Sequence, residues 1–385
     1  MYDLIIIGGG PSGSAAGRIA GQMGLETLLI EKEVFPRYKP CGGAFSEQAM
    51  SYLDFKVPEH IHERNIYGVR THFGRHVIEK HKPYRIATLV TRSILDSYLI
   101  EKAKETGIEI IMGEKVINFE EHRNYVKVYT NNSLYKARYV IVAEGSSGAL
   151  KYRIRRKDQK GEFGICVVTE IEKENQVFDK YTNNLINIHF GISKGGIGWI
   201  FPHEKYFSVG IGGLAKHLPD PKTMMKDFLI ANGFNGDYKL KWSIIPAGGI
   251  KRKIISSRVV LCGDAAGFVD PFYGEGIAYA IRSGQLAAEI LAKIISGKNG
   301  LETIKDYPLR CEYEFGNNLK YSFVLSRLIH LFPSLIFKLF TRGEGVIDQY
   351  LELPAIKKSS KSFLLWLIPL FKVSSFASAI LRKLS

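Results

Sequence analysis

The feature that most constrains this chain is a glycine-rich turn close to its start, set between a strand and a helix. Residues 2–7 form a short, nearly continuous apolar run, which is typical of a strand buried on both faces of a parallel sheet. Gly8, Gly10 and Gly13 follow with GxGxxG spacing, and the small side chains of 14–23 suit a helix packed closely on that sheet. A second apolar run, 25–30, completes a βαβ unit. The chain is therefore predicted to open with a Rossmann-like α/β domain.

The same turn predicts a site for a dinucleotide. Its first glycine allows the tight turn, the second lets the backbone approach a pyrophosphate, and the third allows close helix–strand packing. The helix N-terminus, which begins with Pro11 and Ser12, offers N–H groups and a positive dipole to the phosphates. Glu31 ends the second strand, where a carboxylate accepts hydrogen bonds from a ribose, and Lys32 follows it.

A second segment, about 250 residues later, identifies the dinucleotide as FAD. Residues 262–267 read CGDAAG directly after the predicted strand 258–261. Asp264, preceded by Gly263, is placed to bind a ribityl hydroxyl. Downstream, Gly274, Gly276 and Ile277 lie where a long helix over 275–295 begins, and backbone N–H groups there would face the edge of an isoalloxazine ring. A nicotinamide cofactor needs no such second segment, whereas an extended FAD does.

The rest of the chain divides by pattern. Apolar spacing predicts a helix over 91–106, a strand over 108–112 and a β-meander through 125–142. Short alternating runs between 161 and 246 predict an antiparallel sheet interrupted by one helix over 224–231. We predict an FAD-binding domain (1–55, 88–155 and 250–298), an inserted antiparallel β-sheet substrate domain (56–87 and 156–249) and a C-terminal helical region (299–385).

Composition limits the function classes. The chain carries 53 Lys and Arg against 38 Asp and Glu, a net charge of +15, which favours anionic partners. No zinc-finger, RNP-type or basic-heptad pattern accompanies this charge, so nucleic-acid binding is not expected. Four separated cysteines without a CxxC pair indicate reduced thiols, and no metal site is expected. No signal peptide is visible at the N-terminus, and a cytoplasmic protein is expected.

Several segments, taken in order, resemble the geranylgeranyl reductase family. They are GGGPSG with Glu31, the RYKPCGG segment over 37–43, Arg92 with Asp96, GWIFP over 198–202, and GDAAGFVDPFYGEGI over 263–277. The resemblance implies the p-hydroxybenzoate hydroxylase fold, FAD as cofactor and saturation of isoprenoid chains; archaeal members act on digeranylgeranylglycerophospholipids. Two departures occur. Lys194 and Ile197 replace Pro and Tyr of the family's PxxYxWxFP motif, and Glu144-Gly145 replaces an Asp-Gly pair.

The resemblance also implies roles for individual residues. Cys41, Trp199 and Phe201 are the predicted catalytic-site residues, with the two aromatics as walls of a pocket for a polyprenyl chain. The residues predicted to bind the cofactor are Gly8, Gly10, Pro11, Ser12, Gly13, Glu31, Lys32, Cys41, Gly42, Gly43, Arg92, Glu144, Gly145, Gly263, Asp264, Gly274, Gly276 and Ile277. The predicted electron donor is either NAD(P)H or a ferredoxin-like protein. The sequence contains no second glycine-rich Rossmann motif for a nicotinamide cofactor.

The C-terminal residues suggest a membrane surface. From 321 to 385 nine Lys/Arg, three of them Lys372, Arg382 and Lys383, stand against three acids, among apolar runs such as 363–371. Such helices bind anionic headgroups at an interface, although core helices with solvated lysines show the same pattern. The predicted function is an FAD-dependent reductase of isoprenoid C=C bonds, peripheral on the cytoplasmic membrane face. The alternatives are a monooxygenase or halogenase of the same fold, and a membrane flavoprotein that only carries electrons.

Overall fold

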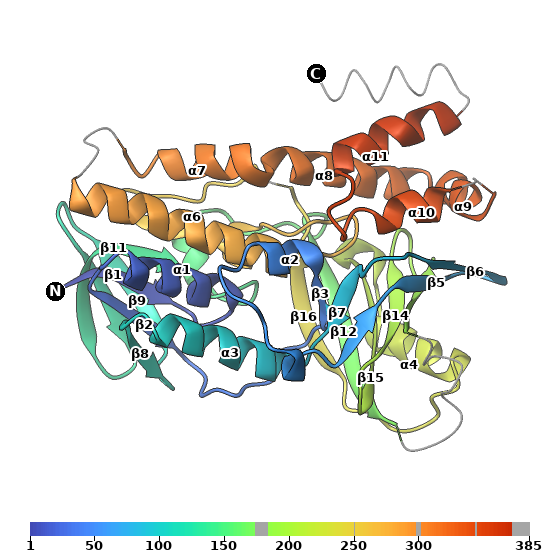
Figure 1. Cartoon of the computed structure of the whole chain (residues 1–385), viewed down its shortest axis with the longest axis horizontal. Helices are drawn as coiled ribbons and strands as arrows, with labels where there is room; N and C mark the ends of the chain where they lie inside the picture. The colour runs from blue at the N-terminus through green and yellow to red at the C-terminus, as the bar shows by residue number, and fades with distance from the viewer. Residues whose placement is uncertain (174–183, 250, 298–301, 343–344, 372–385) are drawn as a thin grey trace.

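The computed structural model describes residues 1–173, 184–249, 251–297, 302–342 and 345–371. Helices α1 (Pro11–Gln22), α3 (Arg92–Lys104) and α6 (Ile277–Ser296) pack beside a seven-stranded sheet at one end of the molecule, and a second seven-stranded sheet forms the other end (Figure 1). The C-terminal helices run along one long side and reach from α6 to the second sheet. The predicted α/β fold with a helical C-terminal region is confirmed.

The first sheet has the order β8-β2-β1-β11-β10-β9. Its pairs β8–β2, β2–β1 and β1–β11 are parallel, and the meander β9-β10-β11 is antiparallel. The predicted meander over 125–142 corresponds to β10 and β11, and β9 precedes it. The long strand β11 pairs with β10 through 134–137 and with β17 through 140–142. Its strands are β1 (Tyr2–Ile7), β2 (Thr27–Glu31), β8 (Glu109–Met112), β9 (Val116–Glu121), β10 (Val126–Thr130), β11 (Leu134–Val142) and β17 (Val259–Leu261).

Helix α1 begins earlier than the predicted residue 14. Gly10 is its N-cap and Pro11 its first residue, a position where proline loses no hydrogen bond because the first N–H groups of a helix have no intrahelical partner. The helix lies against α6 at Gly284, where any side chain would collide with the backbone carbonyl of Ser12. This contact holds the glycine turn and the long helix in one rigid unit.

The second sheet has the order β16-β12-β15-β14-β13-β5-β6. The prediction of an antiparallel sheet is wrong for one pair, because β13 and β5 run parallel from Leu185↔Gly68 to Phe190↔Phe73. These two strands belong to different pieces of the chain, so no hairpin forces them to be antiparallel. The strands are β5 (Gly68–Phe73), β6 (His76–His81), β12 (Phe163–Glu172), β13 (Leu185–Phe190), β14 (Ile197–Pro202), β15 (Tyr206–Leu214) and β16 (Lys241–Pro246).

Two smaller groups of elements complete this half. Helix α4 (Pro221–Ala231) buries Met225, Phe228 and Leu229 against β12 and β15, and Asp220 caps its N-terminus by accepting the Thr223 N–H at 3.1 Å. A three-stranded sheet, β3-β7-β4, carries the chain from the loop at 39–43 into the substrate half. Its elements are β3 (Ala44–Ser46), β4 (Arg64–Ile66) and β7 (Ala87–Leu89), with α2 (Glu47–Ser51) after β3.

The C-terminal region is helical, as predicted, and most of its apolar side chains are core. Ile336, Phe340, Phe363 and Leu364 pack on the second sheet in one cluster with Val69 and Ile188. No single helix of the described residues is long and apolar enough to span a membrane; one pair, 306–331 and 333–341, passes by length and composition but is bent by 103°. Lys372, Arg382 and Lys383 lie outside the described residues. The helices are α7 (Asp306–Cys311), a π-helical turn (Glu312–Gly316), α8 (Asn317–Leu331), α9 (Pro333–Arg342), α10 (Val346–Leu351) and α11 (Ser360–Leu367).

Candidate cofactor and substrate site

The glycine turn has the geometry that an anion-binding loop requires. Gly8 adopts a φ of +104° and donates to the Ile30 carbonyl at 2.8 Å, and a side chain on Gly13 would collide with the Gly8 carbonyl. Helix α1 has no side-chain cap and no acidic residue in its first turn. Its first N–H groups and its dipole are therefore directed at the space above the turn, which suits a pyrophosphate.

Glu31 lies beside this turn. Its carboxylate accepts the N–H of Gly9 at 2.6 Å and the N–H of Glu33 at 2.9 Å, and the residue is 5% exposed. These two bonds fix the carboxylate at the end of β2, where it was predicted to receive a ribose. Lys32, in contrast, stays at the surface and pairs with Glu33 at 3.8 Å.

Two partly buried arginines, Arg37 and Arg92, lie next to the turn. Asp96 is fully buried, accepts two bonds from Arg92 at 2.8 and 2.9 Å, and pairs with Arg37 at 3.1 Å. Burial alone would lower the pKa of Arg92, but the Asp96 carboxylate and the Cys41 thiol raise it, so the guanidinium stays charged. The Nη1 atom of Arg37 is buried and has no hydrogen-bond partner in the described structure. A buried cationic donor beside Gly10 fits a phosphate oxygen, and sequence reasoning missed it.

Asp264, the acidic residue of the second predicted segment, lies among cations. Burial raises its pKa, while the nearby charges of Lys39, Arg92 and Lys151 act in the opposite direction. Burial likewise lowers the pKa of Lys39, and Asp264 opposes that shift. The two glycine-rich segments, far apart in sequence, lie against each other, because a Cβ on Gly263 would lie 3.2 Å from the Cβ of Ser12. Lys39 is a second residue that the sequence reasoning did not single out.

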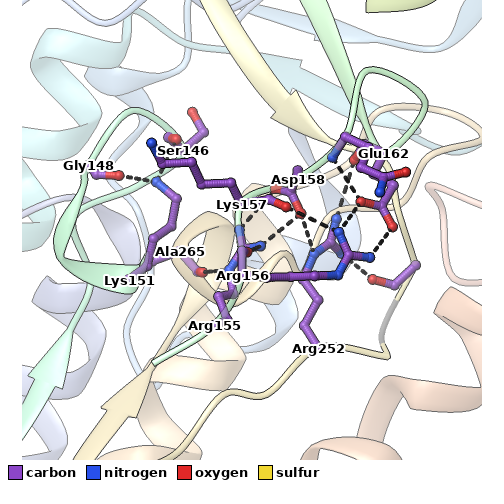
Figure 2. A network of polar contacts seen from close by, with 12 residues as sticks. Ser146, Gly148, Lys151, Arg155, Arg156, Lys157, Asp158, Glu162, Arg252 and Ala265 are labelled. Atoms are coloured by element: carbon purple, nitrogen blue, oxygen red, sulfur yellow. Dashed lines mark hydrogen bonds and ion pairs between the residues drawn. The ribbon is translucent and has the colours of Figure 1, made fainter. Parts of the chain in front are cut away.

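A network of hydrogen bonds and ion pairs holds the loop next to Asp264 (Figure 2). Arg155 donates to the Ala265 carbonyl at 3.1 Å and forms two bonds to Asp158 at 2.8 and 3.0 Å. The Lys151 ammonium group donates hydrogen bonds to the carbonyls of Ser146 and Gly148. The backbone N–H of Lys151 donates to the Glu144 carboxylate at 2.8 Å. The predicted contact pair Glu144-Gly145 is thereby held by Lys151.

The third predicted segment leads into α6. Glu275 is buried and accepts the Ala278 N–H at 2.9 Å, which ties the carboxylate to the first turn of the helix. Asp270 is fully buried, accepts the N–H groups of Phe272 and Tyr273 at 2.8 and 3.2 Å, and is bonded by Ser322 of α8. Gly274 has a φ of +79° and open space around it. The loop at 270–276 is thus fixed from both sides, with its glycine turn left accessible.

The predicted catalytic residues come together where the two sheets approach. A Cβ on Gly42 would lie 2.8 Å from a ring carbon of Phe201 and 3.4 Å from Nε1 of Trp199. Trp199 is 8% exposed and lies across Gly210, while Ser208 of β15 donates to the Cys41 carbonyl at 3.3 Å. The loop 41–43 therefore lies directly against the rings of Trp199 and Phe201, which we call the aromatic wall.

A histidine that sequence reasoning missed holds this loop. His203 is 1% exposed, and its Nε2 lies 2.9 Å from the Gly42 carbonyl while its Nδ1 lies 2.6 Å from Glu63. Tyr206 stacks on its ring at 4.3 Å. Burial alone would raise the pKa of Glu63, but the hydrogen bonds from His203 and Thr91 lower it. The available signal was the position of His203, directly after GWIFP.

Comparison with known proteins agrees with this geometry. Residues 1–212 match the model of a family described as "FAD binding domain". The chain is 28% identical over 357 residues to the digeranylgeranylglycerophospholipid reductase of Methanococcus vannielii, covering 85% of this chain and 87% of that one. It is 28% identical over 313 residues to the menaquinone reductase of Mycobacterium tuberculosis, covering 75% and 76%. A geranylgeranyl bacteriochlorophyll reductase-like structure from Thermoplasma acidophilum superposes with a TM-score of 0.82 at 20% identity, covering 100% and 99%.

Proposed function

Because this chain belongs to the FAD-binding domain family, with FAD as its cofactor, we propose that it is a reductase that saturates C=C bonds of isoprenoid chains. The observation that carries the proposal is the aromatic wall of Trp199 and Phe201 set against the loop 41–43. That loop joins the cofactor half of the molecule to the substrate half. Support comes from the relatives named for geranylgeranyl and digeranylgeranyl reduction.

An isolated trisubstituted alkene accepts hydride poorly, so the site must stabilise positive charge that develops at one carbon. Bound reduced FAD supplies the hydride in this chemistry. The electron-rich faces of Trp199 and Phe201 provide a dry surface that stabilises such a cation and binds an apolar chain. Arg92, next to Cys41, places a fixed positive charge on the cofactor side of the loop.

The His203–Glu63 pair holds the loop 41–43 in place. Both ring nitrogens of His203 face acceptors, the Gly42 carbonyl and the Glu63 carboxylate. We assign the pair a positioning role, because it fixes the Gly42 carbonyl and thereby the contact of the loop with Phe201. Cys41, half-buried at the same loop, stays the predicted catalytic thiol.

The test is anaerobic incubation of the dithionite-reduced protein with digeranylgeranylglyceryl phosphate, followed by mass spectrometry. The lipid should gain mass in steps of about 2 Da, one step per saturated bond. An unchanged lipid would reject the proposal for this substrate. A gain of oxygen, together with substrate-stimulated oxygen uptake in air, would favour the monooxygenase or halogenase alternative instead.

We also propose that the protein works at a membrane surface, peripheral on the cytoplasmic face. The proposal rests on apolar side chains left outside the core: Leu331 is 60% exposed, Phe332 38%, Leu365 50% and Leu370 37%. Exposed Lys338, Lys357 and Lys361 lie in the same C-terminal helices and loops. Cations near apolar side chains favour anionic lipid, by about 1 kcal/mol for each charge at the surface.

Vesicle sedimentation tests the membrane proposal. The protein should bind vesicles that contain anionic phospholipid, less strongly at high salt, and Leu365→Ser with Leu370→Ser should weaken binding. A matched pair of surface changes, Ile117→Ser with Leu134→Ser on the first sheet, should not weaken it. Equal binding by all three proteins would contradict this role for the C-terminal helices.

A further inference from the structure

Two basic segments, 151–162 and 251–253, form a strongly charged surface outside the site. Together they hold nine Lys and Arg against two carboxylates, Asp158 and Glu162. The segments meet where Arg252 contacts Asp158 at 3.1 Å and donates to the Glu162 carbonyl at 3.3 Å (Figure 2). We call the exposed cations of these segments the basic face: Arg153, Arg156, Lys157, Lys160, Lys251 and Lys253.

Both acids of the segments are already neutralised by neighbours. Asp158 is shared by the buried Arg155 and Arg252, and Glu162 pairs with Arg156 at 2.5 Å. Within the described ranges no ion pair engages Arg153, Lys157, Lys160, Lys251 or Lys253. The basic face therefore presents an uncompensated positive field to solvent, which attracts an acidic partner over a distance of about 10 Å at 0.1 M salt.

The buried and half-buried cations of the same two segments contact the loops predicted to hold the cofactor. Arg155 bonds the Ala265 carbonyl, next to Asp264, and the Arg252 guanidinium packs on Gly267. Lys151 bonds the Ser146 carbonyl at 2.8 Å and its backbone bonds Glu144. A partner docked on the basic face would therefore contact the same two segments whose inner cations hold the backbone predicted to bind FAD.

From this placement we propose that the basic face is the docking surface for an acidic iron–sulfur protein that delivers electrons to the bound flavin. The proposal rests on the reductase function, because each C=C bond that is saturated consumes two electrons. Two molecules of reduced partner would each lose one electron to the flavin, and the protons that complete its reduction would come from water. The sequence supplies one dinucleotide fingerprint, which FAD uses, and none for a nicotinamide.

The chemistry of the surface favours a protein over a membrane. Tyr152 is 36% exposed, and the ammonium of Lys157 lies 5.9 Å from its ring centre. An interfacial segment needs apolar side chains to insert, and those are exposed on the C-terminal helices instead. Small, charged, transient contacts are typical of electron-transfer partners, for which electrostatic steering sets the association rate.

The test measures flavin reduction, without any prenyl substrate. Reduced acidic [2Fe–2S] ferredoxin is mixed anaerobically with the FAD-loaded protein, and loss of the oxidised flavin absorbance is followed by stopped flow. The test variant is Lys157→Glu with Lys160→Glu. The matched control, Lys104→Glu with Lys226→Glu, makes the same charge change at exposed positions of α3 and α4.

At low salt the test variant should be reduced at least about tenfold more slowly than the wild type and the control, and in about 1 M salt this difference should disappear. Photoreduction should reduce all three proteins equally, which shows that the flavin site is intact. The proposal is wrong if ferredoxin fails to reduce the wild type, or reduces test and control variants at one rate. It is also wrong if the test variant loses binding to anionic vesicles while its reduction by ferredoxin is unchanged.

Dithionite-driven saturation of digeranylgeranylglyceryl phosphate separates this proposal from the reductase proposal. All three proteins should show the same dithionite-driven rate, because that rate does not depend on docking. If none of them saturates the lipid, the proposed function fails, while the stopped-flow comparison still decides whether the basic face receives an electron carrier.

Discussion

At the scale of the residue, the loop 41–43 depends on the absence of a side chain at Gly42. Gly42→Ala would place a Cβ 2.8 Å from Phe201, so either the ring or the loop has to move. We expect saturation of the prenyl substrate, measured per bound FAD because Gly42 is also a predicted cofactor contact, to fall about 100-fold, since displacements near 1 Å cost that much. Gly161→Ala is the control, because its Cβ would meet nothing closer than 3.8 Å. Equal loss in both variants would refute the contact.

His203 supports the same loop through its two bonds. His203→Leu removes one partner of the partly buried Glu63 carboxylate, which keeps the Thr91 hydroxyl and the Glu204 N–H, and should lower the free energy of unfolding by about 2 kcal/mol. His203→Gln retains a donor for the Gly42 carbonyl and should recover part of the turnover. Thermal melting and steady-state rates measured together check this. If Leu and Gln variants have the same rate, His203 does not position the loop.

Residues of this kind also mark how far the sequence could predict the site. Gly8, Gly13, Glu31 and Asp264 follow local rules of strand, turn and helix, so their places could be predicted. His203 and Glu63 are 140 residues apart, and their bond depends on how the two sheets approach each other. No local pattern contains that information.

At the scale of the element, Asp158 joins Arg252 to Arg155, which donates to the Ala265 carbonyl next to Asp264. Asp158→Ala would leave Arg155 and Arg252 buried without a counter-ion, and we expect a loss of about 3 kcal/mol in the free energy of unfolding. Arg156→Ala removes an exposed pair of the segment 151–162 and should change stability little. Chemical denaturation of both variants decides this, and equal stability would show that the network is not structural.

Asp270 couples the loop before α6 to α8 and gives this junction a pH dependence. Burial raises its pKa to about 7, partly countered by Ser322 and by two backbone N–H groups. The unfolded side chain ionises near pH 4, so between about pH 4 and 7 the folded state holds a proton that the unfolded state has released. Stability contributed by this group is therefore present at low pH and lost as the pH rises through about 7.

Asp270→Asn removes this titration. We expect the free energy of unfolding of the variant to equal that of the wild type near pH 4. Above pH 7 it should be larger by a few kcal/mol, which is the order that the raised pKa implies. Melting temperatures across this range provide the measurement, with the exposed Asp237→Asn as control. A wild-type advantage at every pH would show that the carboxylate itself is required.

At the scale of the whole molecule, the sequence predicted the two halves but not their assembly. The βαβ opening and the meander follow from periodicity. The parallel pair β13–β5 joins strands from different parts of the chain, and the C-terminal apolar residues read equally as a membrane surface or as core. In the structure Ile336, Phe340 and Phe363 pack against the second sheet, so these three residues are core.

The central claim is that reducing equivalents pass from FAD to an alkene held against the loop 41–43. The most direct measurement is a single turnover: the flavin is reduced under anaerobic conditions, digeranylgeranylglyceryl phosphate is added, and absorbance and lipid mass are followed together. The account predicts that the oxidised flavin absorbance returns without oxygen, with one C=C bond lost for each flavin. A flavin that stays reduced beside an unchanged lipid would contradict it.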